Sequence, residues 1–210
     1  LKMLARYHTQ ITHQAIDADF TPRSIQVILR ANLGQDSLQF QVGHDHFHFD
    51  NNKFAESYAY IEAQRAAALA SLGRGDAQSA WQAFGRMTHT AQDFYSHSDY
   101  IPRWLSRFDG GTPPAPEEVD PVFSEILEHP GLHTGRIYQP LDALAFLPFL
   151  RKFALSRLPA DSHGHMNHDS PENSAQFDYV FHASVKRTRI EFEKMIDHLS
   201  DDLLNLFVDR

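Results

Sequence analysis

Residues 54–72 have the sequence FAESYAYIEAQRAAALASL, which is dominated by strong helix-forming residues and stops at Gly73 and Gly75. Asp76 follows as a candidate N-cap for a second helix, DAQSAWQAFGRMTHTAQDFYSHS, which runs to about Ser98. Apolar residues recur in this second segment at intervals of three and four, the spacing of an amphipathic helix. The two segments therefore predict a pair of consecutive long helices.

The rest of the chain also has helical patterns and few others. The remaining predicted helices cover residues 11–20, 23–33, 117–128, 140–158 and 174–208. No stretch alternates apolar and polar residues for long enough to predict a strand. Residues 109–121 and 159–171 are rich in Gly, Pro and acidic side chains and are predicted to be loops. We therefore expect an all-α protein in which residues 1–210 form one helical domain.

Composition excludes several classes of protein. The 210 residues include 19 Lys and Arg against 27 Asp and Glu, so the net charge is −8, which argues against nucleic-acid binding by broad charge neutralisation and against a polybasic lipid anchor. The absence of cysteine excludes disulfides, iron–sulfur clusters and cysteine nucleophiles. The longest apolar stretch, residues 141–150, is shorter than the roughly 20 residues of a membrane span. No targeting segment opens the chain, and because it starts at Leu1 we expect a processed or trimmed N-terminus.

The chain has 14 histidines, and several of them cluster with aspartates. His89, Asp93 and His97 are spaced by four residues in the second long helix, so their side chains share one stripe of that helix. Imidazole and carboxylate groups on one stripe can hold metal ions, and the central carboxylate can bridge two of them. The alternative is a solvated polar face, or a histidine satisfied in the core.

Two further clusters lie in predicted irregular segments. Residues 44–50, HDHFHFD, follow Gln35 and Asp36, and an extended backbone there would point the rings of His44, His46 and His48 to one side. A solvated loop is the favoured interpretation for His44 and His46. The other cluster consists of His163, His165, His168 and Asp169, with His182 further along the chain. His163 and His182 are the favoured candidates for metal ligands there, and the other three residues are more typical of a polar loop. His8, His129, His133 and His198 are assigned structural or surface roles, and an isolated His13 would be too.

Short motifs occur in a characteristic order: THQAI at 12–16, ANLGQD at 31–36, HFDN at 48–51, HTAQDFYSHS at 89–98, and HG at 163–164 with NHD at 167–169. Together they resemble the zinc-dependent phospholipase C family, and most of all its branch related to fungal heterokaryon-incompatibility proteins and to bacterial phosphatidylcholine-hydrolysing phospholipases C. The resemblance spans about residues 8–190. It implies a helical bundle of the phospholipase C and single-strand nuclease type that holds two or three zinc ions.

The resemblance also implies a ligand set, carried over by position. The expected metal ligands are His13, Asp36, His48, His89, Asp93 and His97, followed by His163 and then His182. Asp93 would bridge two ions, and Asp36 would be a terminal ligand and the acceptor of the proton from the attacking water. The last site stays open between His163, His165 with Asp169, and His182. Classical members also use an N-terminal Trp as a ligand, a contact that Leu1 does not support.

The implied activity is that of a phospholipase C. A hydroxide held between zinc ions would cleave phosphatidylcholine-like phospholipids to diacylglycerol and a phosphorylated headgroup. Manganese and iron are alternatives to zinc. Residues 141–158 are either an amphipathic element facing lipid or, preferably, an ordinary core helix. The candidates for an aromatic cage around choline are Tyr95, Tyr100, Trp104 and Tyr138.

Two other functions fit the same residues. One is a zinc-dependent single-strand nuclease, which shares the metal chemistry but is disfavoured by the net charge of −8. The other is a non-catalytic module in which metals tie helices together, with closed coordination and no water position. We expect a phospholipid substrate, transient contact with a membrane surface, no nucleic acid and no obligate protein partner. The resemblance favours a secreted or extracellular protein, although the residues themselves leave the compartment open.

Overall fold

The computed structural model describes residues 5–40, 43–145 and 149–210, and all regular secondary structure within these ranges is helical. The long helices are α1 (Ala5–Ile16), α2 (Pro22–Gly34), α3 (Phe54–Leu72), α4 (Ala77–His97) and α9 (Phe177–Ile196), followed by α10 (Asp201–Val208). The short ones are α5 (Tyr100–Ser106), α6 (Ser124–Leu127), α7 (Leu141–Ala145) and α8 (Arg151–Leu155). The predicted all-α fold is confirmed.

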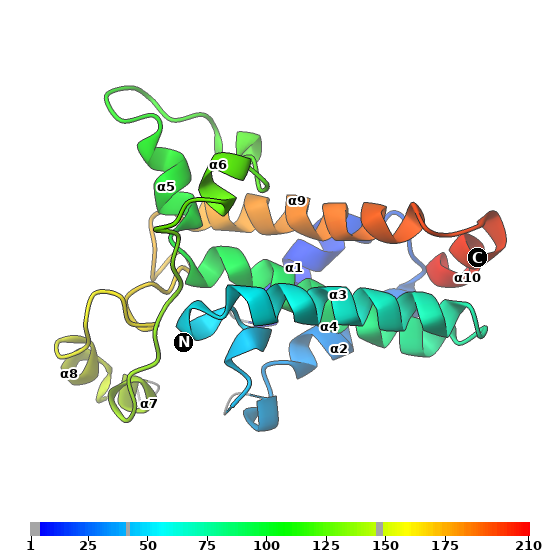
Figure 1. Cartoon of the computed structure of the whole chain (residues 1–210), viewed down its shortest axis with the longest axis horizontal. Coiled ribbons are helices and arrows are strands. Elements are labelled where there is room, and N and C mark those ends of the chain that lie inside the picture. Colours follow the sequence, from blue (N-terminus) through cyan, green and yellow to red (C-terminus); the bar gives the residue numbers. More distant parts are fainter. Residues whose placement is uncertain (1–4, 41–42, 146–148) are drawn as a thin grey trace.

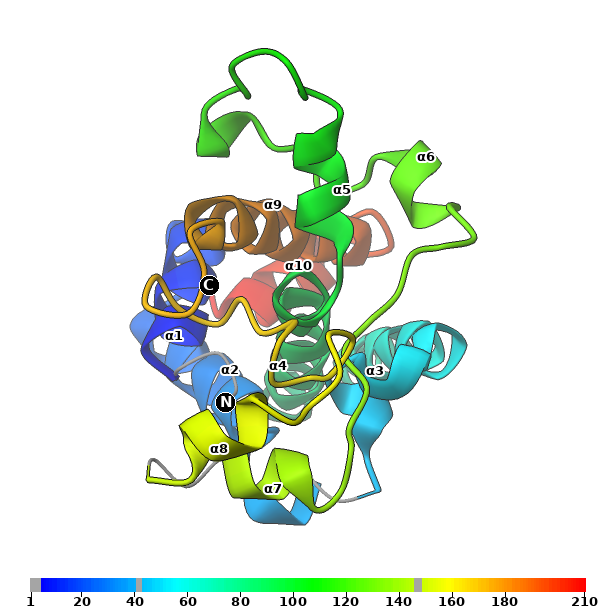
Figure 2. The same ribbon diagram turned by 90° about the vertical axis from the view of Figure 1, so that its left-hand side faces the viewer.

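Helix α4 is the central element of the bundle. It packs against α2, α3 and α9, and the view along the bundle in Figure 2 shows it surrounded by these helices and α1. Nearly every residue from Ala80 to His97 is buried. A helix buried on all sides is normally apolar throughout, yet the second half of α4 carries several polar side chains. Those side chains need partners inside the protein.

The first half of α4 is held by an aromatic core. Phe84 lies among Phe20, Phe192 and Phe207, with ring centroids 5.4–6.4 Å from its own. Trp81 donates its indole N–H to the backbone oxygen of Phe207 at 2.6 Å, so the one polar atom of this side chain is satisfied. Burial of each such ring stabilises the fold by roughly 1.5–3 kcal/mol. This core anchors α10 against α4 and leaves the other end of α4 to polar groups.

Close approach of α2 to α4 depends on a glycine. A Cβ atom added to Gly85 would lie 2.2 Å from the backbone oxygen of Ile28 and 3.0 Å from Cβ of Ala31, so only glycine fits at this crossing. The same crossing places Asn32 of α2 against Thr88, with 3.3 Å between Asn32 Nδ2 and Thr88 Oγ1. The position of α2 therefore sets where Asp36, just beyond its end, meets α4.

The boundaries of α3 and α4 agree with the prediction, and local chemistry accounts for them. Asp76 Oδ1 accepts a hydrogen bond from the Ser79 N–H at 3.0 Å and so caps α4. Gly75 has φ +77, which lets the chain turn sharply between the two helices.

Four other predicted helices are wrong in extent. The predicted helix over 11–20 is α1, which begins at Ala5 and ends at Ile16. Only α6 and a 3₁₀ turn, Pro116–Glu118, form within 117–128, where Pro121 interrupts the helical pattern. The helix predicted over 174–208 is divided into α9 and α10 because Ser200 caps a new helix. Residues 140–158 form α7 and α8, and residues 146–148 lie outside the described part of the chain.

Helices α7 and α8 stand apart from the bundle (Figures 1 and 2). They share a small apolar core in which Ala154 and Leu158 are buried against Tyr138, Leu141, Leu144 and Leu155. We call the described residues from 138 to 158 the α7–α8 projection. No helix in the described ranges is long and apolar enough to cross a membrane.

Candidate metal centre

The polar face of α4 forms the centre of a buried cluster of imidazoles and carboxylates. His89, Asp93 and His97 are each at most 1% exposed. That burial excludes a solvated polar helix face. Buried groups of this kind must be paired with one another or with a bound cation.

The carboxylate of Asp93 faces two sets of ligand atoms. Its Oδ2 lies 2.8 Å from His48 Nδ1 and 3.1 Å from His89 Nε2, and the two ring nitrogens are 3.2 Å apart. Its Oδ1 lies 3.3 Å from His8 Nε2. Ligand atoms bound about 2.0–2.1 Å from a tetrahedral zinc ion are about 3.3 Å from each other. Oδ2 and the two ring nitrogens therefore have mutual spacings close to those of such a site.

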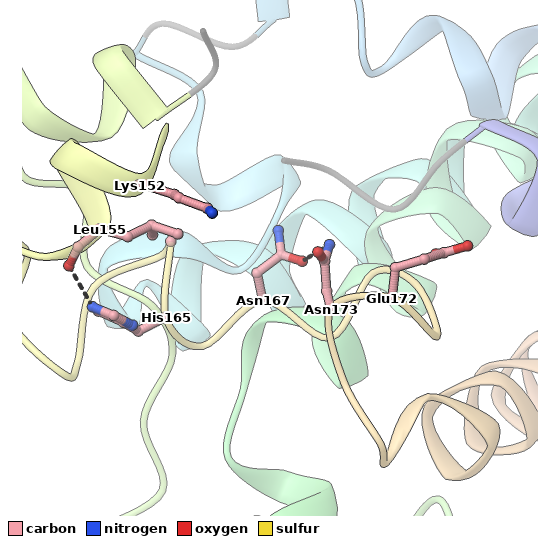
Figure 3. A pocket seen from close by; sticks show the side chains of 7 residues that line it. Lys152, Leu155, His165, Asn167, Glu172 and Asn173 are labelled. Atoms are coloured by element: carbon pink, nitrogen blue, oxygen red, sulfur yellow. Dashed lines mark hydrogen bonds between the residues drawn. The ribbon is translucent and has the colours of Figure 1, made fainter. Parts of the chain in front are cut away.

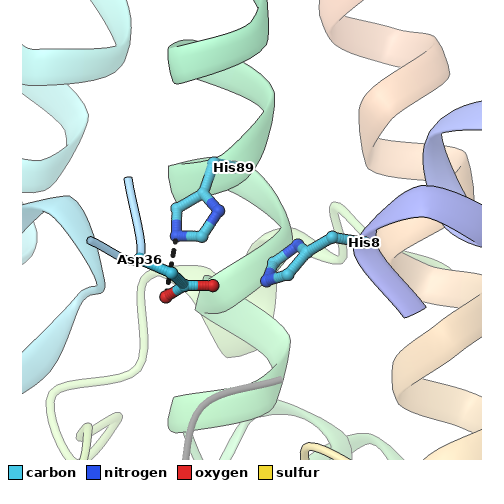
Figure 4. A group of neighbouring side chains, drawn as sticks. All are labelled: His8, Asp36 and His89. Atoms are coloured by element: carbon cyan, nitrogen blue, oxygen red, sulfur yellow. Dashed lines mark ion pairs between the residues drawn. The ribbon is translucent and has the colours of Figure 1, made fainter. Parts of the chain in front are cut away.

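Asp36 and His8 extend this group on one side. Figure 4 shows His8 reaching in from α1 and Asp36 from the segment after α2, both toward His89. Asp36 Oδ1 is 3.8 Å from His89 Nε2, and the rings of His8 and His89 stack with centroids 4.4 Å apart. The Asp36 side chain is 22% exposed, whereas those of Asp50 and Asp169 are 5% and 1% exposed. Solvent therefore reaches the cluster on the side of Asp36.

A further group lies at the end of α4. Asp50 Oδ1 is 2.8 Å from His163 Nδ1 and 3.4 Å from His97 Nδ1. His97 Nε2 faces Asp169 Oδ1 at 3.4 Å. Asp50, His97 and His163 could hold a metal ion between them, as could His48, His89 and Asp93, or His8, Asp36 and His89.

Several ligand atoms in the cluster lack hydrogen bonds. Within the described part of the chain, no hydrogen bond satisfies His8 Nε2, His97 Nε2, Asp93 Oδ1 or Asp169 Oδ1. These atoms face each other in two pairs, His8 with Asp93 and His97 with Asp169. A divalent cation between the members of each pair would satisfy both of them. The residues present therefore fit a metal centre with nitrogen and oxygen ligands.

Neighbouring acceptors fix the orientation of two of the rings. Nδ1 of His8 lies 2.6 Å from Gln92 Oε1, and Nδ1 of His97 lies 2.9 Å from the backbone oxygen of His48. In each pair the ring N–H donates to an oxygen, so Nε2 carries the free lone pair. A hydrogen bond of this kind on the outer nitrogen is the usual support of a metal-bound histidine.

Gln92 links three helices beside the cluster. Its Nε2 donates to Thr12 Oγ1 of α1 at 3.2 Å and to Thr188 Oγ1 of α9 at 3.0 Å. Its Oε1 accepts from Asn32 Nδ2 of α2 at 3.3 Å as well as from His8. Each of these contacts requires the same orientation of the amide. Gln92 therefore keeps His8 in place relative to α4.

Left-handed backbone positions aim His48 and Asp50 at the same helix. Phe49, Asn51 and Asn52 have φ of 56°, 57° and 56°. Such residues cost about 1–3 kcal/mol each, and local packing must maintain them. The Phe49 ring is fully buried against Phe54, Tyr58 and Phe94. The extended backbone considered for residues 44–50 is therefore wrong, and turns bring both side chains inward.

Backbone pairing brings His163 to the cluster. The N–H of Gly135 donates to the His97 oxygen at 2.9 Å, and the N–H of His163 donates to the Arg136 oxygen at 2.8 Å. A Cβ at Gly135 would lie 2.6 Å from Cα of His163, so the two segments approach this closely only with glycine there. The N–H of Asn51 donates to the Gly135 oxygen at 2.9 Å. The segment around Gly135 thus holds together the parts of the chain that carry Asp50, His97 and His163.

The cluster shifts the pKa values of its members in opposite directions. Burial alone would raise the pKa of Asp93, but the imidazoles of His89 and His97 outweigh it and hold that pKa well below its usual range. Burial lowers the pKa of His89 to about 4, against the opposing effect of Asp93. His97 has a raised pKa because the carboxylates of Asp50 and Asp93 outweigh burial. A protonated His97 must release its proton before it can bind a cation.

The structure places two predicted ligands outside the cluster. His13 lies on the exposed side of α1, where its Nδ1 is 3.0 Å from Asp17 Oδ1. It is five residues from His8 and points away from the face of α1 that contacts the core. His182 of α9 lies 3.5 Å from Glu117 instead. The other predicted ligands, Asp36, His48, His89, Asp93, His97 and His163, belong to the three groups.

Sequence reasoning missed His8 and did not select Asp50. Tyr7, His8, Ile11, Thr12, Ala15 and Ile16 form the buried stripe of α1, and their spacing of three and four identifies the helix once it begins at Ala5. His8 falls on that stripe and His13 does not. Asp169, considered for the last site only with His165, contacts His97, whereas His165 Nε2 lies 2.9 Å from the Leu155 oxygen.

A pocket of about 410 Å³ lies beside the loop that carries His163 and Asp169, and Figure 3 shows the side chains that line it. Its lining residues are Lys152, Leu155, Gly164, His165, Asn167, Glu172 and Asn173. Asn167 also hydrogen-bonds Asp169, so one wall of the pocket is in contact with a group that faces His97. The predicted choline cage does not form, because Tyr95, Tyr100 and Trp104 are buried in the main core and the hydroxyl of Tyr138 donates to Asp161.

One family model matches part of the chain. Residues 4–104 match the model of the VWA7 N-terminal domain, so α1 to α5 are similar to that domain over slightly less than half of the chain. The match includes His8, Asp36, His48, Asp50 and α4, and stops before His163 and Asp169. The family description names no activity. No curated protein and no solved structure matches the chain.

Proposed function

We propose that this chain is a metal-dependent phosphodiester hydrolase that cleaves phospholipids in the manner of a phospholipase C. The observation that carries the proposal is the buried cluster around Asp93, in which ligand atoms face each other without hydrogen bonds in two pairs, His8 with Asp93 and His97 with Asp169. Histidine and carboxylate ligands suit zinc, with manganese or iron as alternatives. The lipid substrate follows from the resemblance to zinc-dependent phospholipases C.

The cluster supplies what such a reaction requires. Zinc ions, when bound, offset the charge of a phosphoryl group and lower the pKa of water to about 7. His8, Asp36, His48, His89 and Asp93 would hold one part of the metal set, and Asp50, His97, His163 and Asp169 the other. Asp93 is central to the first part, because its two oxygens face different partners there, His8 and His48.

Asp36 is assigned a second role as proton acceptor. Its carboxylate is the most exposed of those in the cluster, so a water molecule from solvent could reach it. The buried members hold their geometry and exclude solvent, while Asp36 would take the proton of the attacking water. This access to solvent favours a catalytic centre over a closed structural metal site.

The test compares Asp93→Asn with Asp17→Asn, in which an exposed aspartate just after the end of α1 is changed. Metal content is measured by elemental analysis, and hydrolysis is measured with phosphatidylcholine and with single-stranded DNA, each with and without a chelator. We expect Asp93→Asn to lose metal and hydrolysis together and Asp17→Asn to retain both. Full metal content and turnover in Asp93→Asn would contradict the assignment of Asp93.

The same assay separates the other candidate functions. Chelator-sensitive cleavage of single-stranded DNA without cleavage of phospholipid would identify a nuclease. Stoichiometric metal without hydrolysis of either substrate would favour a structural role for the metals. Absence of stoichiometric metal under every loading condition would contradict all three functions, the phospholipase, the nuclease and the structural metal module.

A further inference from the structure

The α7–α8 projection carries most of the large apolar surface found exposed on the described residues. The exposed large hydrophobic side chains there are Phe149 at 80%, Phe153 at 49% and, elsewhere, Val122 at 42%. Phe149 and Phe153 are four residues apart. Two exposed aromatic side chains this close in sequence are unusual on a water-facing surface and indicate a contact site.

The buried side of this element already has its partners. Ala154 and Leu158 pack into the small core with Tyr138, Leu141, Leu144 and Leu155. Phe149 and Phe153 do not belong to that core and are exposed. Their exposure therefore does not reflect an incomplete fold.

The charge around the two rings is opposite in sign to that of the chain. Lys152 and Arg157 are exposed on either side of Phe153, and residues 149–158 contain no acidic residue. The Arg157 guanidinium lies over the Phe153 ring, 3.7 Å from its centroid. Aromatic side chains flanked by basic ones suit the interface of an anionic bilayer, where rings enter the acyl boundary and cations meet phosphates. This local surface is therefore basic although the net charge of the whole chain is −8.

The projection is also connected to the metal centre. Figure 3 shows Lys152 and Leu155 of α8 on one side of the 410 Å³ pocket and Asn167 on the other. Asn167 also hydrogen-bonds Asp169. A surface that docks through Phe149 and Phe153 would place lipid headgroups at the mouth of this pocket.

We infer that Phe149, Phe153, Lys152 and Arg157 form a docking surface for an anionic phospholipid membrane. The inference deepens the proposed function, on which the choice of a lipid partner rests. Docking itself requires neither bound metal nor turnover, so binding and hydrolysis can be measured separately.

The test is co-sedimentation of the full chain with vesicles in the presence of a chelator. The vesicles are phosphatidylcholine alone or phosphatidylcholine mixed with phosphatidylserine. We expect binding to the mixed vesicles, weaker binding to phosphatidylcholine alone, and loss of binding as salt screens the charges. The double variant Phe149→Ser with Phe153→Ser should bind at least about tenfold more weakly, because it removes both apolar anchors.

Val122→Ser is the matched control, since it removes an exposed apolar side chain away from the projection. It should bind like the unmodified chain, and both variants should keep their melting temperatures because the changed side chains are exposed. Lys152→Glu with Arg157→Glu should abolish the preference for phosphatidylserine. Equal binding by the double phenylalanine variant, or no vesicle binding by the unmodified chain, would overturn the inference.

Two further measurements separate the remaining outcomes. Sedimentation equilibrium detects a second copy as the occupant, and a dimer that dissociates in the double phenylalanine variant would replace the lipid assignment. Hydrolysis of a soluble short-chain phosphatidylcholine reports on the metal centre alone. Vesicle binding without hydrolysis of this substrate would support the docking surface and contradict the proposed function. Hydrolysis without vesicle binding would contradict the docking surface only.

Discussion

At the scale of single residues, the second half of α4 is a sequence of side chains with distinct positions and partners. Gln92 and Asp93 are adjacent, yet the first links α1, α2 and α9 through hydrogen bonds and the second faces the imidazoles. A neutral amide bonds with hydroxyl and amide groups, whereas a carboxylate attracts cations. Glutamine at position 93 would remove the carboxylate from among the imidazoles, and aspartate at position 92 would break the hydrogen bonds that link the helices.

His8 and His13 provide a direct comparison between the ligand set implied by resemblance and that placed by the structure. His8→Ala removes a nitrogen that faces Asp93, so we expect metal affinity to fall at least about tenfold, with loss of hydrolysis. His13→Ala changes an exposed ring paired with Asp17 and should leave both properties unchanged. Metal titration of the two variants checks this, and the opposite ranking would restore His13 as the ligand.

At the scale of elements, the crossing of α2 and α4 controls the site from a distance. Gly85 lies one turn before His89 on α4 and touches the backbone of α2, whose end carries Asp36. The helices therefore fix the separation of Asp36 and His89 through contacts that include neither side chain.

Gly85→Ala should weaken both the fold and the site. The added methyl group would overlap the Ile28 oxygen, so we expect a loss of about 1–3 kcal/mol in the free energy of unfolding even after the gain in helix propensity. Metal affinity should fall too as α2 moves outward. Gly73→Ala is the control, because its new methyl group would make ordinary contacts at 3.6 and 3.7 Å. Denaturant titration measures the free energy of unfolding of both variants. Equal stability of the two would contradict the role of this crossing.

At the scale of the whole molecule, a second buried charge group links α3 to α9. Glu191 is fully buried and accepts a hydrogen bond from Arg187 Nε at 2.6 Å, and it also pairs with Arg65 of α3. Burial alone would raise the pKa of Glu191, but Arg187, Lys194 and Arg65 outweigh it and hold the pKa below its usual range.

This group predicts how stability depends on pH. Because the folded pKa of Glu191 lies below its unfolded value of about 4.3, its contribution is complete above that value and is lost as pH falls through the folded pKa. Glu191→Gln should therefore cost about 3–5 kcal/mol at pH 7 and less in acid. The exposed Glu193→Gln should change little. Urea unfolding of the metal-free protein from pH 7 to pH 3 checks this, and a constant difference across that range would contradict it.

Metal loading should stabilise the whole chain. The cluster joins α1, α4 and the segments that carry Asp36, His48 and His163, so a cation bound there favours the folded state. At a free zinc concentration of about one hundred times Kd, the gain is about 2.7 kcal/mol, which corresponds to a rise in Tm of roughly 5–10 °C. Calorimetry with and without a chelator measures it. Asp93→Asn should lose the rise, and an unchanged Tm in the unmodified chain would argue against the centre.

Helical periodicity predicted the architecture well because it depends on neighbours in sequence. The bounds of α3, the start of α4 and the shared face of His89, Asp93 and His97 all follow from local chemistry. The positions of Asp50 and His163 depend on positive φ at Phe49 and on backbone pairing around Gly135, and neither has a local sequence signal. His8 was accessible to sequence reasoning but needed the correct start of α1. Metal occupancy and hydrolysis remain predictions.

The cluster around Asp93 also draws on residues from His8 to Asp169, which lie far apart in the order of translation. A ribosome adds about 5–20 residues per second, so α4 leaves it some seconds before Asp169 has been made. Throughout that interval the nascent polypeptide has acidic and imidazole groups ready but no finished coordination shell. If the cluster binds cations as proposed, the complete set would therefore be acquired late, after synthesis has passed Asp169.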